Sequence, residues 1–181
     1  MTQEQIRETW QEAAGRFYAP TPDEFEAMYR RNKETALEQL TKKYKRFSLL
    51  GLVMGIMCCC YMLPNMIFPE HLRIWITLSF SAYFLIASGM DYWLYKGVSA
   101  IDCFTMTVSE VAEKAMYYKR KHLQFIAILL PLAFAVIGFI IYAAGGNKYL
   151  IAGVLFGALV GGCVGYRQYL DFMAEYKKVV S

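Results

Sequence analysis

The sequence predicts an all-α membrane protein, a four-transmembrane-helix bundle of two antiparallel hairpins with helical cytoplasmic extensions. Two observations lead to this prediction. Of the 181 residues, 57% are hydrophobic and 19% are charged, a balance too apolar for an ordinary soluble domain. The apolar residues also gather in four blocks, each near the roughly 20 residues with which a helix crosses a bilayer. The same composition argues against a nucleic-acid partner, because a basic binding surface must face water.

These blocks divide the chain into seven segments. In chain order we predict N-terminal cytoplasmic helices (1–46), span one (47–68), span two (74–95), a cytoplasmic helical loop (97–122), span three (123–144), span four (149–166) and a cytoplasmic tail (167–181). The connections after spans one and three are only a few residues long. Short connections join antiparallel neighbours, so spans one and two are expected to form one hairpin and spans three and four the other.

The distribution of positive charge predicts the orientation. All 19 Lys and Arg residues except Arg73 and Lys148 lie before span one, between spans two and three, or after span four. The positive-inside rule places such segments in the cytoplasm. We therefore expect a multi-pass protein with both the N-terminus and the C-terminus in the cytoplasm.

A long helix is predicted to begin at Pro22. Thr21 and Glu24 form a capping box around it, and no Gly or Pro follows until Gly51, so the helix is expected to run unbroken into span one. Its apolar residues recur at helical spacing and form a stripe: Phe25, Met28, Tyr29, Ala36, Leu40, Tyr44 and Phe47. We interpret this stripe as packing on the protein's own middle loop, with an outside protein partner as the alternative.

Two further helical segments are expected in the cytoplasm. In the middle loop, Ser99 with Asp102 three residues later indicates a helix cap, and the residues that follow show an apolar face. Near the start of the chain, Ile6, Trp10 and Phe17 predict a short helix. Together with the long helix, these segments are expected to form a small helical layer continuous with the bundle.

A juxtamembrane basic cluster precedes span one. It consists of Lys42, Lys43, Lys45 and Arg46. Lysines beside anionic lipid are ordinary membrane anchors, so we interpret the cluster as an anchor and a specific lipid site as the less favoured alternative.

Span four carries a regular glycine pattern. Gly153, Gly157, Gly161 and Gly165 are spaced by four residues, so they share one helix face. Such a face lets two helix backbones approach closely in lipid. Packing within the chain is the default expectation, against span three or against span one, whose Gly51 and Gly55 form a GxxxG motif of their own. Homo-oligomerisation is the alternative.

Asp91 is the one ionisable residue within the predicted spans. A charge in that position usually has a partner, and Arg167 lies at a matching level at the cytoplasmic end of span four. We expect an ion pair between Asp91 and Arg167 that links the two hairpins. The alternative is that the two residues gate a path for a proton or an ion.

No catalytic, cofactor-binding or metal site is predicted. Cys58, Cys59 and Cys60 are consecutive, so a helix points them in different directions and they cannot share a metal ion. The two histidines, His71 and His122, are expected on opposite sides of the membrane. The chain also contains no phosphate-binding loop and no HExxH or GxSxG motif. We therefore expect neither a cofactor nor enzymatic activity.

Four stretches resemble a group of small uncharacterised four-span bacterial inner-membrane proteins. They are Lys43 to Phe47, Ser99 to Glu110, Lys119 to Gln124 with Pro131 beyond, and Gly165 to Gln168. The resemblance implies a location in the bacterial inner membrane and, because some such proteins are encoded beside a sigma factor, a regulatory role. It implies no catalytic residues.

The functional prediction follows from where the unusual features of the sequence lie. Long cytoplasmic helices and a glycine-rich span favour a non-enzymatic, membrane-anchored interaction or regulatory protein that acts through its cytoplasmic helices. Its expected partners are the lipid bilayer, a cytoplasmic protein and a second copy of the chain. The alternative is a small transporter or channel subunit that uses the glycine face of span four in an oligomer.

Overall fold

The computed structural model describes residues 22–60 and 70–180, and within them every regular element is a helix. These helices are α2 (Pro22–Cys60), α3 (Glu70–Ser99), α4 (Val108–Ala143) and α5 (Lys148–Val180). The predicted all-α class is confirmed for this part of the chain. The helix expected around Trp10 and the end of the first predicted span, residues 61–68, lie outside the described residues.

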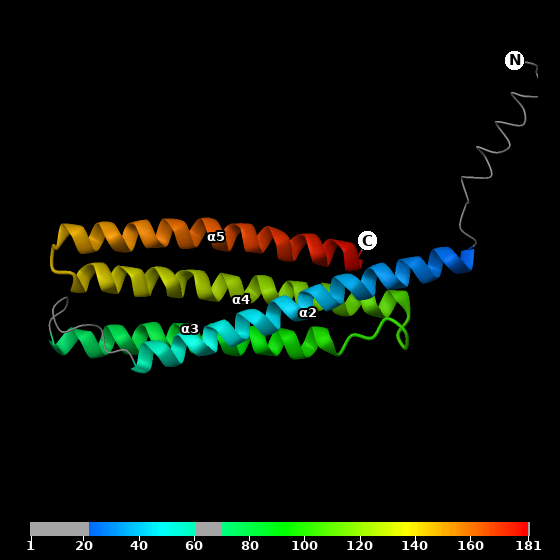
Figure 1. The fold of residues 1–181 in the computed structure, drawn as a ribbon, viewed down its shortest axis with the longest axis horizontal. Coiled ribbons are helices and arrows are strands. Elements are labelled where there is room, and N and C mark those ends of the chain that lie inside the picture. Colours follow the sequence, from blue (N-terminus) through cyan, green and yellow to red (C-terminus); the bar gives the residue numbers. More distant parts are fainter. Residues whose placement is uncertain (1–21, 61–69, 181) are drawn as a thin grey trace, which may run out of the picture.

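Three of the helices lie along the long axis of the molecule, and α2 crosses them at an angle (Figure 1). The first helical residue of α2 is Pro22, and the helix continues for 39 residues without interruption, as predicted. It contacts α5 where Tyr44 meets Tyr176, and it then follows α3, where Ser48 meets Ser88. The start of α2 and the end of α5 lie toward the same end of the bundle (Figure 1).

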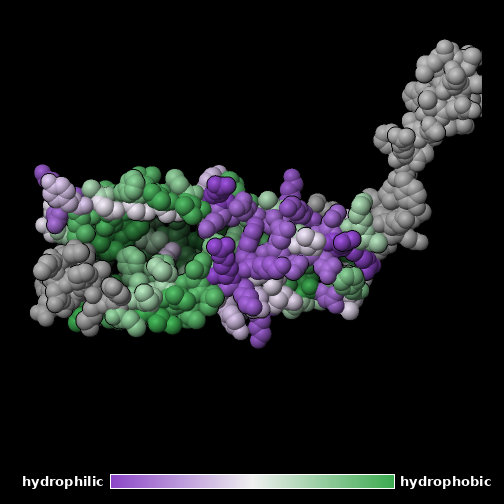
Figure 2. Space-filling view, in the orientation of Figure 1, coloured by the Kyte–Doolittle hydropathy of each residue, from purple (hydrophilic) through white to green (hydrophobic). Residues whose placement is uncertain are grey.

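Figure 2 shows that one half of the molecule has an apolar surface and the other a polar one. We call residues 22–46, 97–122 and 167–180 the polar layer, and the other described residues the apolar half. Stretches of α3, α4 and α5 are long and apolar enough to cross a membrane. With its 36 residues, α4 is about 54 Å long, nearly twice the roughly 30 Å thickness of a hydrocarbon core. A helix of that length is longer than a membrane span requires, and its first part, residues 108–122, belongs to the polar layer.

The largest core of the described residues belongs to the polar layer. Its buried members are Ala36, Leu37, Leu40, Tyr44, Leu94, Val98, Ile101, Cys103, Val111, Ala115, Phe172, Tyr176 and Val179. We call this set the main core, and all of it except Leu94 lies in the polar layer. Side chains such as Leu40 and Val179 are completely buried. Burial of each such side chain stabilises the fold by about 1.5–3 kcal/mol, so helices from distant parts of the sequence are held together here.

The stripe predicted on the long helix packs mainly on the protein itself. Ala36, Leu40 and Tyr44 are buried in the main core, whereas Met28 remains 52% exposed. The stripe was predicted to pack on the middle loop alone. In the structure the end of α5 packs against it as well. Residues 167–180, expected as a tail, are a helical continuation of the fourth predicted span.

In the apolar half, α2 and α3 form a close contact through small residues. Ser81 Oγ donates a hydrogen bond to Gly55 O at 2.8 Å, and Ser88 Oγ donates one to Ser48 O at 2.7 Å. A Cβ atom on Gly51 would lie 3.1 Å from the Ser88 Cβ, so the absence of a side chain there allows the approach. Helices in lipid associate through such small residues and hydroxyl groups, because no hydrophobic force drives them together.

The helix cap expected at Ser99 and Asp102 was wrong. Ser99 instead ends α3, and Asp102 accepts hydrogen bonds from Phe104 N and Thr105 Oγ1 in an irregular turn. The true cap of α4 is Thr107, whose hydroxyl accepts from Glu110 N while the Glu110 carboxylate accepts from Thr107 N. This reciprocal pair satisfies two free amides, which Ser99 and Asp102 do not do.

The short connection predicted between spans three and four is a turn through Gly145 and Gly146. Gly145 and Gly146 have φ values of 57° and 84°, which L-residues with side chains rarely adopt. Asn147 Oδ1 then accepts from the backbone N–H groups of Tyr149 and Leu150, both at 3.2 Å, and so caps α5. The turn places α5 beside α4 in the opposite direction (Figure 1).

Candidate functional site

The centre of the polar layer is a group of aromatic side chains from three helices. Tyr44 of α2 and Tyr176 of α5 are completely buried, and their hydroxyl oxygens lie 3.0 Å apart in a hydrogen bond. Phe172 of α5 stacks on the Tyr44 ring with centroids 4.7 Å apart. His122 of α4 meets Phe172 at 5.0 Å and Tyr44 at 5.5 Å. We call these four residues the aromatic cluster.

Burial keeps the titratable members of the aromatic cluster uncharged near neutral pH. It raises the pKa of Tyr44, an effect to which the neighbouring Tyr176 and the charge of Asp91 add. Burial also raises the pKa of Tyr176 to about 12 and lowers the pKa of His122 to about 4. The His122 Nε2 atom has no hydrogen-bond partner among the described residues. The cluster therefore joins the helices mainly by packing, with one hydrogen bond to orient the tyrosines.

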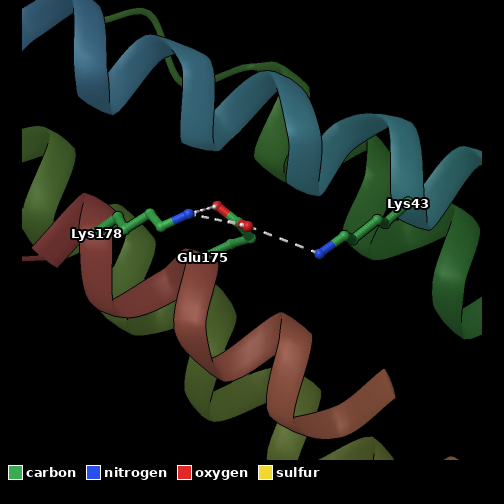
Figure 3. A network of polar contacts seen from close by, with 3 residues as sticks. All are labelled: Lys43, Glu175 and Lys178. Carbon is green, nitrogen blue, oxygen red and sulfur yellow. Dashed lines mark hydrogen bonds and ion pairs between the residues drawn. The ribbon is translucent and has the colours of Figure 1, made fainter. Parts of the chain in front are cut away.

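A buried carboxylate on α5 lies between Lys178 of the same helix and Lys43 of α2 (Figure 3). Glu175 is 8% exposed, and its two oxygens accept from Lys178 Nζ at 3.2 and 3.1 Å. From α2, Lys43 Nζ approaches Glu175 Oε1 at 3.9 Å. Glu175 thus contacts Lys178 of its own helix and Lys43 of α2, which lies just before predicted span one. We call these three residues the Glu175 network.

Lys33 is a second charged residue in the interior. It is 3% exposed, and its Nζ has no hydrogen-bond partner among the described residues. The Nζ lies 4.3 Å from the centroid of the Tyr29 ring. A cation–π contact of this kind contributes roughly 0.5–2 kcal/mol, which does not offset the several kcal/mol that burial of an unpaired charge costs.

A pocket of about 440 Å³ lies between α2 and α5 beside Lys33. From α2 it is lined by Asn32, Lys33 and Gln39 among others, and from α5 by Glu175 and Lys178. The pocket therefore brings together the unpaired buried lysine and part of the Glu175 network. We call it the Lys33 pocket.

The ion pair expected between Asp91 and Arg167 is absent. No contact within 4.0 Å joins the two side chains, both of which the structure describes, and Arg167 is exposed. Asp91 lies instead on the side of α3 that approaches Tyr44, whose pKa its charge raises. Arg167 is therefore not the partner of Asp91 in this structure.

The glycine face of α5 does not pack within the described chain. A Cβ atom added to Gly153, Gly157, Gly161 or Gly165 would meet no atom of another described helix within 4 Å. The default expectation of packing within the chain is therefore contradicted for these residues. Gly51 and Gly55 both face α3. The packing of these glycines against the fourth span, which we considered from the sequence, is therefore also contradicted.

The juxtamembrane basic cluster divides into two parts. Lys45 and Arg46 are exposed, and Lys42 forms an exposed ion pair with Glu38 at 2.7 Å. Lys43 faces the other way, toward Glu175 and the Phe172 ring. Three of the four cations thus remain at the surface, where contact with anionic lipid headgroups is possible, and Lys43 belongs to the interior network.

Residues 172–179 contribute to the main core, although they were expected only as part of a cytoplasmic tail. Phe172, Tyr176 and Val179 follow the i, i+4, i+7 spacing of a buried helix face, and no Gly or Pro occurs after Gly165. That spacing was the sequence pattern from which a buried helix face could have been predicted here. For Lys33 the sequence contains no such signal, because a lysine between Asn32 and Glu34 reads as part of a solvated face.

The five described cysteines are free, and no group of three or more His, Cys, Asp or Glu residues in the described ranges is placed to hold a metal ion. No family model, no curated protein and no solved structure matches the chain. The function is therefore inferred from the arrangement of this chain's own residues.

We expect Glu175→Gln to destabilise the protein by about 1–3 kcal/mol, because a charge-assisted contact to Lys178 and the attraction of Lys43 are lost in a buried site. The matched control is Glu38→Gln, which removes an exposed pair with Lys42 and is expected to cost less than about 0.5 kcal/mol. The measurement is denaturant unfolding in detergent micelles. Equal losses in the two variants would contradict the importance of the Glu175 network.

We expect stability to fall as the pH drops from about 6.5 to about 4 because of His122. The unfolded chain takes up a proton at His122 near pH 6.5, whereas burial delays uptake in the folded chain to about pH 4. The contribution of His122 to the free energy of unfolding is fully present above pH 6.5, and it decreases by about 3 kcal/mol between pH 6.5 and pH 4. Unfolding of the wild type and of His122→Phe, compared from pH 7.5 to 4, checks this. The variant should show the shallower pH dependence, and parallel curves would refute the assignment.

Proposed function

We propose that this chain is a non-enzymatic integral membrane protein, a membrane-anchored interaction or regulatory protein that acts through its cytoplasmic helices. In this proposal it crosses the bacterial inner membrane four times as two hairpins, with both termini in the cytoplasm. The distribution of Lys and Arg supports this orientation. The three long apolar helices and the shared end of α2 and α5 in Figure 1 are consistent with it.

One observation carries the functional proposal: the main core lies in the polar layer and not in the apolar half. Membrane insertion alone requires no packed core outside the lipid. This chain nevertheless extends its helices well beyond the hydrocarbon thickness and packs them around the aromatic cluster. The result is a defined folded surface outside the predicted spans, which is what recognition of a protein partner requires.

The surface of the polar layer also carries large apolar side chains. Phe104, in the turn between α3 and α4, is 66% exposed, and Met28 of α2 is 52% exposed. Exposed apolar residues in the apolar half face lipid, but these two lie in the polar layer. Aromatic residues and methionine are enriched at protein interfaces, so Phe104 and Met28 are the contact residues we assign to a partner.

A photo-crosslinking amino acid at Phe104 or Met28 is expected to give a protein adduct of defined mass in native membranes. Phe156, 71% exposed on the apolar half of α5, is the lipid-facing control and should give no such adduct. Thermal melting of each variant shows whether it is folded. The same adduct from all three positions, or none from the polar layer, would overturn the proposal.

The second candidate is a small transporter or channel subunit assembled through α5. The observation that favours it is the open glycine face, Gly153 to Gly165, together with the hollow between the helices of the apolar half in Figure 2. A second copy placed on this face would bring two α5 backbones into contact in lipid. In that arrangement Asp91 and Arg167 are available to gate a path near the polar end.

Gly157→Leu tests whether copies of the chain join through this face, which the second candidate requires. Because a side chain there meets no atom of another described helix, we expect the monomer to keep its thermal stability. If copies join through this face, the oligomer fraction seen by crosslinking in nanodiscs will fall at least about tenfold. Gly138→Leu on α4, also open but outside the repeat, is the matched control. An unchanged oligomer fraction in Gly157→Leu would exclude the glycine face as the contact.

A further inference from the structure

The Lys33 pocket contains a positive charge for which the described chain supplies no counter-charge. Lys33 is almost completely buried, no carboxylate lies within 4.0 Å of its Nζ among the described residues, and no oxygen accepts a hydrogen bond from it. The Tyr29 ring stabilises the cation but carries no net charge. An ammonium without a counter-charge in this position is stabilised by an anion that enters the pocket, because opposite charges attract.

The rest of the pocket adds to this positive character. Glu175 is its buried carboxylate, and Lys178 and Lys43 both lie against that group. Among the residues that line the pocket, the two lysines Lys33 and Lys178 outnumber the single carboxylate, Glu175, so the lining has a net positive charge. If Lys178 turns toward a bound anion, Lys43 remains as a counter-ion for Glu175.

Neutral donors complete the arrangement. Asn32 and Gln39 line the same pocket from α2, and neither amide forms a hydrogen bond within the described residues. Amide N–H groups beside lysine ammonium groups suit the oxygens of a phosphate. The volume of about 440 Å³ is larger than a single ion needs and accommodates a small phosphorylated molecule.

We infer that the Lys33 pocket is a binding site for a small soluble phosphate-bearing anion, held by Lys33 and Lys178. This inference does not depend on the proposed function, since a ligand site and a protein-docking surface can exist independently. The soluble source follows from position. Lys33 lies 14 residues before Phe47, where span one is predicted to begin, which is about 21 Å along the helix and beyond the reach of a lipid headgroup.

The test measures the thermal midpoint of the full chain in nanodiscs of neutral lipid, with inorganic phosphate titrated against sodium chloride at matched ionic strength. We expect a saturable rise with phosphate and no equivalent rise with chloride. Lys33→Met is expected to weaken the phosphate response at least about tenfold in apparent affinity, and Lys178→Met to weaken it less. Lys42→Met and Lys177→Met, which change exposed lysines of the same two helices, should respond like the wild type.

Two results would overturn the inference. In the first, the thermal midpoint of the wild type responds to phosphate no more than to chloride. In the second, the Lys33→Met variant responds to phosphate as the wild type does. If Lys33→Met does not fold, Lys178→Met carries the same comparison on the other helix. In a second arm, nanodiscs containing phosphatidic acid replace soluble phosphate. A stabilisation by this lipid that requires Lys33 would overturn the soluble source, and its absence, together with the phosphate response, supports it.

Discussion

The structure depends on one constraint, which is that the same long helices are apolar along one half of the molecule and polar along the other. In water, apolar side chains are driven together, and the main core forms where α2, α3, α4 and α5 leave the predicted membrane region. In lipid that force is absent, so helices approach only where small residues and hydroxyl groups favour contact. The pair of α2 and α3 has such residues at Gly51, Ser81 and Ser88, and the glycine face of α5 stays open.

This division explains why the chemical features of the molecule gather in the polar layer. The aromatic cluster fixes α2, α4 and α5 at one level, and it thereby positions groups on either side of it. Toward the apolar half, Asp91 comes near Tyr44, and toward the end of the bundle Glu175 meets Lys43 and Lys178. The Lys33 pocket lies between the same two helices that carry the Glu175 network. A change in the angle between α2 and α5 would therefore alter the Tyr44–Tyr176 hydrogen bond, the Lys43–Glu175 pair and the Lys33 pocket together.

Much of the fold was predictable because helix formation and membrane insertion depend on local composition. The start of α2 at Pro22, its unbroken course and the turn at Gly145 and Gly146 all follow from residue types at single positions. The prediction failed where a contact between distant helices, or the exact residue at which a helix starts, decided the outcome. Asp91 and Arg167 were expected to pair from depth alone, and Ser99 was expected to cap a helix that Thr107 caps. The site was therefore only partly visible: Lys43 was singled out as a membrane anchor, but neither its contact with Glu175 nor the burial of Lys33 was foreseen.

The sequence by itself determined that this protein is helical, that it is apolar enough to enter a membrane, and that its positive charges lie at one end of its spans. These properties are sums over neighbouring residues, so they need no knowledge of distant contacts. The tertiary structure decided which faces are covered. It buried Tyr44 against Tyr176, left the glycines of α5 open and enclosed Lys33 beside a pocket. Such outcomes depend on how residues more than a hundred positions apart are brought together, which no local pattern specifies.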